Sequence, residues 1–248
     1  MTTDHTGVLL DRFAELGRSV RDTYGPHSQA SVFVLYEELI SLRTVLTAER
    51  GHERVSQRVR DLREQIARAY LASGGAAPPP RREIISVDPP LLRFDREIFE
   101  RRYSGVSGRV LAQTIEIRDP ETPLDLLRPG ASYMFVIDEM DRLLVWTRPF
   151  VLADLVFGRN RATVDGVPVA HPMLVPERLL ARAAGEIVLI GANRVSMVVA
   201  NTKSGHFQPP RESVTVVREA CRRLFHLPGE DVDVFHLFPA AGTERTVR

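Results

Sequence analysis

The first third of the chain carries its hydrophobic side chains at steps of three and four, the period of an amphipathic α-helix. The clearest stretch covers residues 29–48, and an earlier one covers about 8–22, before the break at Gly25-Pro26. A third stretch follows Gly51 and repeats its apolar positions every seven residues. The pattern predicts helices packed as a hairpin or bundle. It leaves open that the third helix pairs with a second copy of the chain, giving a homodimer through the N-terminal helices.

The helical pattern stops at a run of small residues and prolines. Residues 73–80 read Ser-Gly-Gly-Ala-Ala-Pro-Pro-Pro, which cannot continue a helix and has no apolar side chain of any size to bury. The run predicts a linker at 74–82, between a helical domain at 1–73 and a second domain at 83–248.

Beyond the linker the hydrophobic positions alternate over short runs, which is typical of strands. The two clearest patterns are hairpins at 133–147 and 186–200, each with a polar turn. Further elements are expected as follows: strands at 83–87, 108–117 and 231–238, and helices at 94–102, 176–183 and 211–226. The fold class expected is therefore α+β, a helical hairpin or bundle followed by an antiparallel-sheet domain with a C-terminal helix.

Composition narrows the classes of protein. The 248 residues are 44% hydrophobic and carry 33 basic and 32 acidic side chains, a net charge of +1, as in an ordinary globular chain and unlike a dedicated nucleic-acid binder. No apolar run approaches the roughly 18 residues of a membrane span, and the start lacks the pattern of a signal peptide. We therefore expect a cytoplasmic chain that does not enter a membrane. The single cysteine, Cys221, excludes an intramolecular disulfide framework, and its place on an apolar helical stripe favours the core over a nucleophile.

The candidate site is the loop at 201–210, which is expected to leave a strand and enter a helix. Its prolines suit a helix start, so free backbone N–H groups and the positive end of a helix dipole are expected nearby. Lys203 is the only lysine among the 33 basic residues. We expect the loop to hold a phosphate or carboxylate through Lys203, Asn201, Gly205 and Phe207.

Acid–base chemistry is expected from the same loop and two neighbours. His206 has an ordinary pKa of about 6.5 and can transfer a proton near neutrality, and Ser204 adds a hydroxyl. Closure of the second hairpin brings Glu186 toward Asn201, and His171 precedes the same hairpin. Simpler roles stay open: Ser204 and Asn201 closing the turn, Glu186 as an exposed strand-end charge, and His171 as an ordinary loop residue.

No cofactor or metal ion is expected. The acidic turn at 138–141 fits a cation, but tight acidic hairpin turns are commonly just solvated, and His226 and His236 lack the spacing of metal ligands. No phosphate-loop, dinucleotide, zinc-protease or serine-hydrolase motif occurs in the chain.

Two short motifs flank the second hairpin. One is Ala184-Gly185-Glu186, and the other reads Asn201-x-x-Ser-Gly-His206-Phe207-x-Pro209. In this order, with His171-Pro172 upstream, they resemble a pattern in C-terminal modules of bacterial polymorphic or secreted toxin-like proteins, in which tyrosine stands more often at the position of Phe207. The resemblance supports the boundaries of the site, leaves the helical first third unexplained and implies no particular activity.

Three readings of the function follow. The first is an enzyme, a metal-free hydrolase, nuclease or group transferase that acts on a phosphate-bearing substrate such as a nucleotide or RNA. His206 would be its acid or base, and Glu186 or His171 the complement. The second is a non-catalytic regulatory protein that binds a small anion or a partner. A scaffold in which the loop only shapes a helix entry is the third reading.

Overall fold

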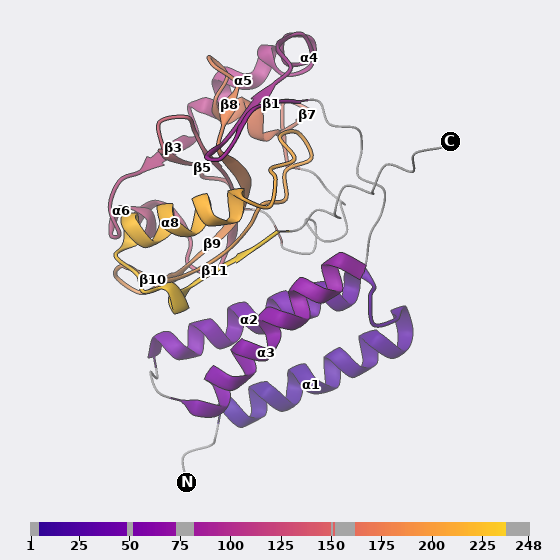
Figure 1. Ribbon diagram of the computed structural model, residues 1–248. Coiled ribbons are helices and arrows are strands. Elements are labelled where there is room, and N and C mark those ends of the chain that lie inside the picture. The colour runs from indigo at the N-terminus through magenta and orange to yellow at the C-terminus, as the bar shows by residue number, and fades with distance from the viewer. Residues whose placement is uncertain (1–4, 49–51, 73–81, 150, 152–161, 237–248) are drawn as a thin grey trace.

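The chain is described by a computed structural model that covers residues 5–48, 52–72, 82–149, 151 and 162–236 (Figure 1). Helices come first, an antiparallel-rich sheet follows, and a helix lies near the C-terminal end. The α+β fold class expected from the sequence is confirmed. None of the described helices combines the length and apolarity needed to cross a bilayer.

Three helices form the N-terminal layer: α1 (His5–Tyr24), α2 (Gln29–Ala48) and α3 (Glu53–Ala72). Val55, Val59, Leu62 and Ile66 of α3, which follow this repeat, are buried in one cluster with apolar side chains of α2. Helix α1 packs on α2 on the side away from the sheet (Figure 1). The predicted bundle is therefore present. The predicted linker at 74–82 lies outside the described residues except for Arg82, so the division into two domains stays a prediction.

The main sheet has six strands in the order β11-β10-β9-β4-β5-β3. Both predicted hairpins are present, as β4–β5 and β9–β10, and only β10–β11 is parallel. The strands are β3 (Thr114–Ile117), β4 (Ser132–Ile137), β5 (Leu143–Trp146), β9 (Ala183–Gly191), β10 (Val195–Asn201) and β11 (Val232–Phe235).

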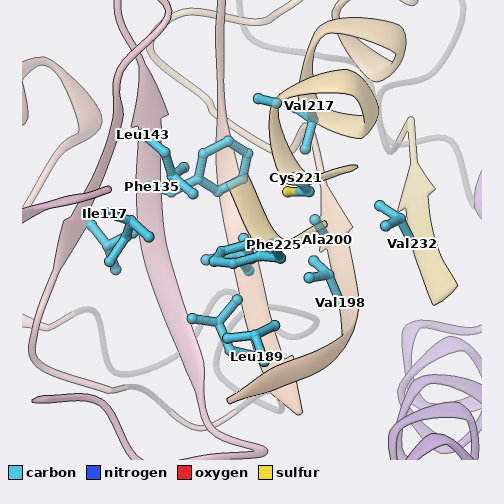
Figure 2. Packing of buried hydrophobic residues seen from close by; sticks show 14 of the residues in the cluster. Ile117, Phe135, Leu143, Leu189, Val198, Ala200, Val217, Cys221, Phe225 and Val232 are labelled. Carbon is cyan, nitrogen blue, oxygen red and sulfur yellow. The ribbon is translucent and has the colours of Figure 1, made fainter. Parts of the chain in front are cut away.

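Helix α8 (Ser213–Phe225) covers one face of this sheet (Figure 2). Phe225, Cys221 and Val217 pack there against side chains such as Phe135 and Ala200. Cys221 is fully buried, and burial raises the pKa of its thiol to about 12. The prediction that Cys221 belongs to the core is confirmed.

Two separate layers share the opposite face. Helices α2 and α3 pack on β9, β10 and β11, where Val188 and Val199 face them. The other layer covers Val136 and Ala184. It is built from β2 (Pro90–Phe94), α4 (Arg96–Arg102), α5 (Ser104–Leu111) and the 3-10 turn η1 (His171–Leu174).

Smaller elements complete the fold. Strands β1 (Arg82–Val87), β2 and β8 (Leu180–Ala181) form a small sheet, and β6 (Thr163–Val164) pairs with β7 (Val167–Pro168). A short helix, α6 (Thr122–Leu126), precedes β4, and the 3-10 turn η2 (Gly229–Asp231) precedes β11.

Two predicted elements are wrong. The strand expected at 108–117 is helix α5 followed by a shorter strand, β3, because Val106 and Val110 are buried four residues apart on one helical side. The helix expected at 176–183 is a turn followed by β8 and the start of β9. Residues 180–181 pair with 92–93 of β2, so a long-range strand pairing outweighs the local pattern.

Buried charges join the helical layer to the sheet. Arg43 of α2 donates from Nε to Asp233 Oδ2 of β11 at 2.7 Å, and a second nitrogen lies 3.6 Å from Asp231 Oδ1. The Arg43 side chain is 4% exposed and that of Asp233 is 2% exposed. Arg63 of α3 also pairs with Asp233. Because both helices meet one carboxylate, Asp233 orients this layer on the edge of the sheet.

We predict that Asp233→Asn destabilises the fold strongly. Loss of the carboxylate charge leaves the buried Arg43 with only the more distant Asp231 carboxylate, and removing one partner of a buried ion pair typically costs about 3–5 kcal/mol. The matched control is Glu53→Gln, which breaks the exposed pair Arg60–Glu53 and is expected to cost less than about 1 kcal/mol. Urea unfolding followed by circular dichroism measures both. Equal effects of the two variants would contradict the assigned role of Asp233.

Candidate functional site

The site is built around the open end of the β9–β10 hairpin. Ile187 pairs with Ala200, which places Glu186 beside Asn201, and the Glu186 N–H donates to Asn201 Oδ1 at 3.3 Å. Hairpin closure thus brings Glu186 to Asn201, as the sequence predicted.

Gly185 allows a close approach of the two strands. A Cβ atom on this residue would lie 1.9 Å from the backbone oxygen of Asn201, so no side chain fits without separating the strands. The Gly185 carbonyl is bonded to His171 Nε2 at 3.1 Å. One glycine therefore joins three predicted site residues, His171, Asn201 and the adjacent Glu186.

His171 is buried at the first position of η1, not in an open loop. Burial lowers the pKa of its imidazole to about 3, and the nearby His206 acts in the same direction. The ring is therefore neutral at physiological pH. In a neutral ring, the proton on Nε2 donates to the Gly185 carbonyl and Nδ1 is left as an acceptor.

His206 is half-buried in the loop after β10, and its ring centre lies 6.5 Å from that of His171. Its Nε2 is hydrogen-bonded to the phenol oxygen of Tyr103 at 3.0 Å. The rings of Tyr103 and Phe94 pack edge-on around the imidazole, with centroids 5.6 Å and 5.8 Å away. These contacts hold the ring in one orientation while part of it stays accessible.

Tyr103 was not found from the sequence. It lies between α4 and α5, where its N–H ends α4 by donating to Phe99 O, and its side chain is buried. Nothing local marks it as a site residue, because its partner His206 is 103 positions away. Only the packing of α4 and α5 over the sheet brings the phenol to the imidazole.

Glu186 is buried on the sheet face shared by the two layers. Along β9, Ala184 belongs to the cluster under α5 and Val188 to the cluster under α2 and α3, so Glu186 lies between them. Its Oε2 has no hydrogen-bond partner among the described residues. Ser132 Oγ also has no hydrogen-bond partner among these residues. Ser132 lies opposite Val188 on the neighbouring strand β4, and therefore on the same face of the sheet as Glu186. Two buried polar atoms on one face therefore lack protein partners.

Burial raises the pKa of Glu186 to about 8, although Lys203 and a hydrogen bond to Asn201 oppose the shift. Lys203 is half-buried, and burial lowers the pKa of its ammonium group while Glu186 opposes that shift. Glu186 is therefore mostly protonated at neutral pH, like the carboxylic acids that enzymes use as proton donors. The simpler reading of Glu186 as an exposed strand-end charge is wrong.

Several loop residues hold the backbone. Asn201 Oδ1 also accepts from the Lys203 N–H at 2.9 Å, and the fully buried Ser204 Oγ accepts from the Phe207 N–H at 3.2 Å. Phe207 is buried and packs on Phe94. The geometry thus gives Asn201 and Ser204 the turn-closing role, and it does not support a catalytic Ser204 or a ligand-binding Phe207 ring. Gly205 is exposed at the tip of the turn.

The helix entrance lies farther along the chain than expected. Pro209 and Pro210 precede a turn at 211–212, and α8 begins only at Ser213. Residues 207–212 therefore separate His206 from the first turn of the helix. The expected contribution of the helix dipole to the loop has no support in this arrangement.

The acidic turn at 138–141 is closed by its own residues. Asp138 is fully buried, and its carboxylate accepts from the N–H groups of Met140 and Arg142 and from Arg142 Nε at 2.7 Å. Among the residues that the structure describes, no group of His, Cys, Asp and Glu side chains is arranged to hold a metal ion.

Comparison with known proteins returns nothing: no family model matches the chain, and no curated protein or solved structure resembles it significantly. Function is therefore inferred from the residues and geometry of this site.

We predict that Gly185→Ala destabilises the fold by about 3 kcal/mol or more, because the added methyl group would overlap the Asn201 backbone. Gly108→Ala is the matched control, since Gly108 is exposed in α5 with open space around it and alanine favours a helix by up to about 1 kcal/mol. Urea unfolding is expected to give effects of opposite sign. Equal stability of Gly185→Ala and the native chain would contradict the close approach.

The buried Glu186 predicts a pH-dependent stability. Its pKa is about 8 in the fold against 4.5 in the unfolded chain, so the folded state holds the extra proton between these values. The stability that this proton contributes is lost as pH rises through about 8. We expect Glu186→Gln to remove this loss, so the melting temperature of the native chain should fall relative to the variant between about pH 4.5 and 8 and run parallel to it at higher pH.

The control for this measurement is Glu219→Gln, because Glu219 lies on α8 in an exposed pair with Arg222. The pH dependence of its melting temperature should follow that of the native chain. Parallel curves for Glu186→Gln and the native chain would show that Glu186 is ionised in the fold.

Proposed function

We propose that the chain is an enzyme that acts on an anionic, phosphate-bearing substrate, a nucleotide or RNA, by acid–base chemistry at the His206 site. The observation that carries the proposal is the half-buried imidazole of His206, oriented by the Tyr103 phenol and flanked by the neutral His171. A fixed, partly accessible imidazole is the commonest proton-transferring group in enzymes.

The neighbouring side chains supply complementary groups. Glu186 holds a proton at neutral pH, and Lys203 lies close enough to alter its pKa. In cleavage of an RNA strand, His206 would take the proton of the 2′-hydroxyl as its oxygen bonds to phosphorus. Glu186 would give a proton to the departing 5′-oxygen as its bond to phosphorus breaks. Lys203 would stabilise the negative charge on the phosphate oxygens.

The unpartnered Glu186 Oε2 and Ser132 Oγ add support. Buried polar atoms in folded proteins almost always have a hydrogen-bond partner. A polar group of a bound substrate reaching the layer between α5 and α2 would supply one. We include in the proposal a cytoplasmic place of action, expected from the composition, and a toxin-like character, expected from the resemblance of the two motifs.

A second candidate is a non-catalytic regulatory protein that binds a small anion. The observation that favours it is that Asn201, Ser204 and Phe207 are all occupied in shaping the loop. A loop held so firmly, with Lys203 and His206 left partly accessible, suits recognition of an anion without turnover. This candidate includes a homodimer formed through the N-terminal helices.

We predict that His206→Gln lowers activity at least about a hundredfold with the fold intact, because a proton-transferring group is typically worth about that much. Tyr103→Phe removes only the orienting phenol and is expected to have a smaller effect. The substrates to test are a fluorescently labelled mixed-sequence RNA oligonucleotide and nucleoside triphosphates, the latter followed by phosphorus NMR. His52→Gln, in the residues before α3, is the control and should retain full activity.

Anion binding is measured separately from turnover. Titration of inorganic phosphate against the imidazole resonances of His206 reports anion binding whether or not catalysis occurs. Perturbation of these resonances with no turnover of any substrate would favour the regulatory protein. Turnover that survives His206→Gln, or a His206 resonance that no phosphate compound perturbs, would overturn the proposal.

A further inference from the structure

A cavity lies in the N-terminal helices, away from the His206 site. It has a volume of about 860 Å³ and lies between α1 and the pair α2–α3. Sites for small molecules typically measure about 300–1,000 Å³, so this one can hold a ligand of that class. Its apolar lining includes Leu10, Phe13 and Ala14 of α1 and Val34 and Leu35 of α2.

Helix α1 buries its apolar side only in part, although Leu9 and Leu10 pack against the core of the helical layer. Leu9, Leu10 and Phe13 are only half-buried, whereas the apolar positions of α2 and α3 are mostly fully buried. Val8 is 61% exposed and Leu16 is 42% exposed. Packing between α1 and α2 is therefore incomplete around Leu10 and Phe13, which line the cavity, and an apolar occupant would bury these two side chains further.

The charges around the cavity are mainly positive. Arginines come from α1 and α3, and the acidic side chains are Asp11 and Glu38. Glu38 is buried and already accepts two hydrogen bonds of 2.6 Å from Arg58, so its charge is balanced within the wall. Arg68 pairs with Glu64. Arg18 and Arg21 form no ion pair with any residue in the described part of the chain.

Arg21 lies over the cavity because of Gly17. A Cβ atom at Gly17 would lie 3.1 Å from a terminal nitrogen of Arg21 and 4.0 Å from a methyl group of Val34. The missing side chain thus gives the guanidinium room to fold back along α1 toward α2. An arginine that lines a partly apolar cavity matches an anionic group attached to a hydrocarbon chain.

We propose that this cavity binds a single-chain amphiphilic anion, a long-chain fatty acid. Its carboxylate would pair with Arg21 and Arg18, and its chain would lie along Leu10, Phe13 and Val34. Each methylene group taken from water adds favourable free energy, which is why a long chain is expected to bind better than acetate. This site is independent of the proposed chemistry at His206.

The test is titration calorimetry of the full chain with oleate, below the concentration at which oleate forms micelles. We expect saturable binding of one oleate, weakened at least about tenfold in a double variant that carries Arg18→Gln and Arg21→Gln. Arg12→Gln, also exposed on α1 but outside the cavity lining, is the matched control and should bind normally. Dodecyltrimethylammonium, a cationic amphiphile, should bind at least about tenfold more weakly than oleate.

A filling variant tests the place of binding. Ala14→Trp puts a large side chain into the lining and should block oleate, while light scattering records the oligomeric state. If Ala14→Trp fails to fold, the arginine variants still decide, because their side chains are exposed. No saturable binding of oleate, or equal binding in the arginine double variant, would overturn the proposal. A third result would also overturn it: the native chain binds no oleate and is a dimer, and Ala14→Trp dissociates that dimer. The cavity would then be occupied by a second copy of the chain.

Discussion

The close contact of Gly185 with the backbone of Asn201 is the constraint on which the site depends. Because no side chain fits between them, the β9–β10 hairpin closes tightly at its open end. The carbonyl of the same glycine holds the imidazole of His171, and the next residue, Glu186, is held beside Asn201. Asn201 in turn starts the loop that carries Lys203 and His206. One backbone approach therefore sets the positions of His171, Glu186 and the start of the loop.

The second constraint is that two layers share one face of the sheet. Helices α2 and α3 cover it at the β9–β10–β11 end, while η1, α4 and α5 cover it at the β4–β5 end. Glu186 lies where these layers meet, and this burial is what keeps its carboxyl group protonated at neutral pH. His171 responds to the same environment in the opposite direction, because burial favours the neutral form of both groups. The site therefore combines a neutral acid and a neutral base at one pH.

Much of this arrangement could be predicted from the sequence. The helical spacing of apolar residues predicted α2 and α3, and the alternation of apolar and polar residues predicted both hairpins. Closure of the second hairpin predicted that Glu186 lies beside Asn201. Errors occurred where the local pattern was short or a distant pairing decided the structure. The region around Val110 forms a helix in place of the expected strand, because its valines are spaced for a helix. Leu180 lies in a strand in place of the expected helix, because it pairs with β2. The burial of Glu186 could not be predicted because it depends on two layers from distant parts of the chain.

Tyr103 shows why the chemistry of the loop could not be derived from its own residues. The toxin-like pattern has tyrosine more often where this chain has Phe207. Because phenylalanine has no hydroxyl group, the sequence predicts no phenol in the loop. Phe207 instead fills the core beneath Phe94, and the phenol at His206 comes from the junction of α4 and α5. The buried ring of Phe207 anchors the loop through packing alone. The hydroxyl that contacts His206 is thus supplied by a separate element, so the orientation of the imidazole depends on how α4 and α5 pack on the sheet.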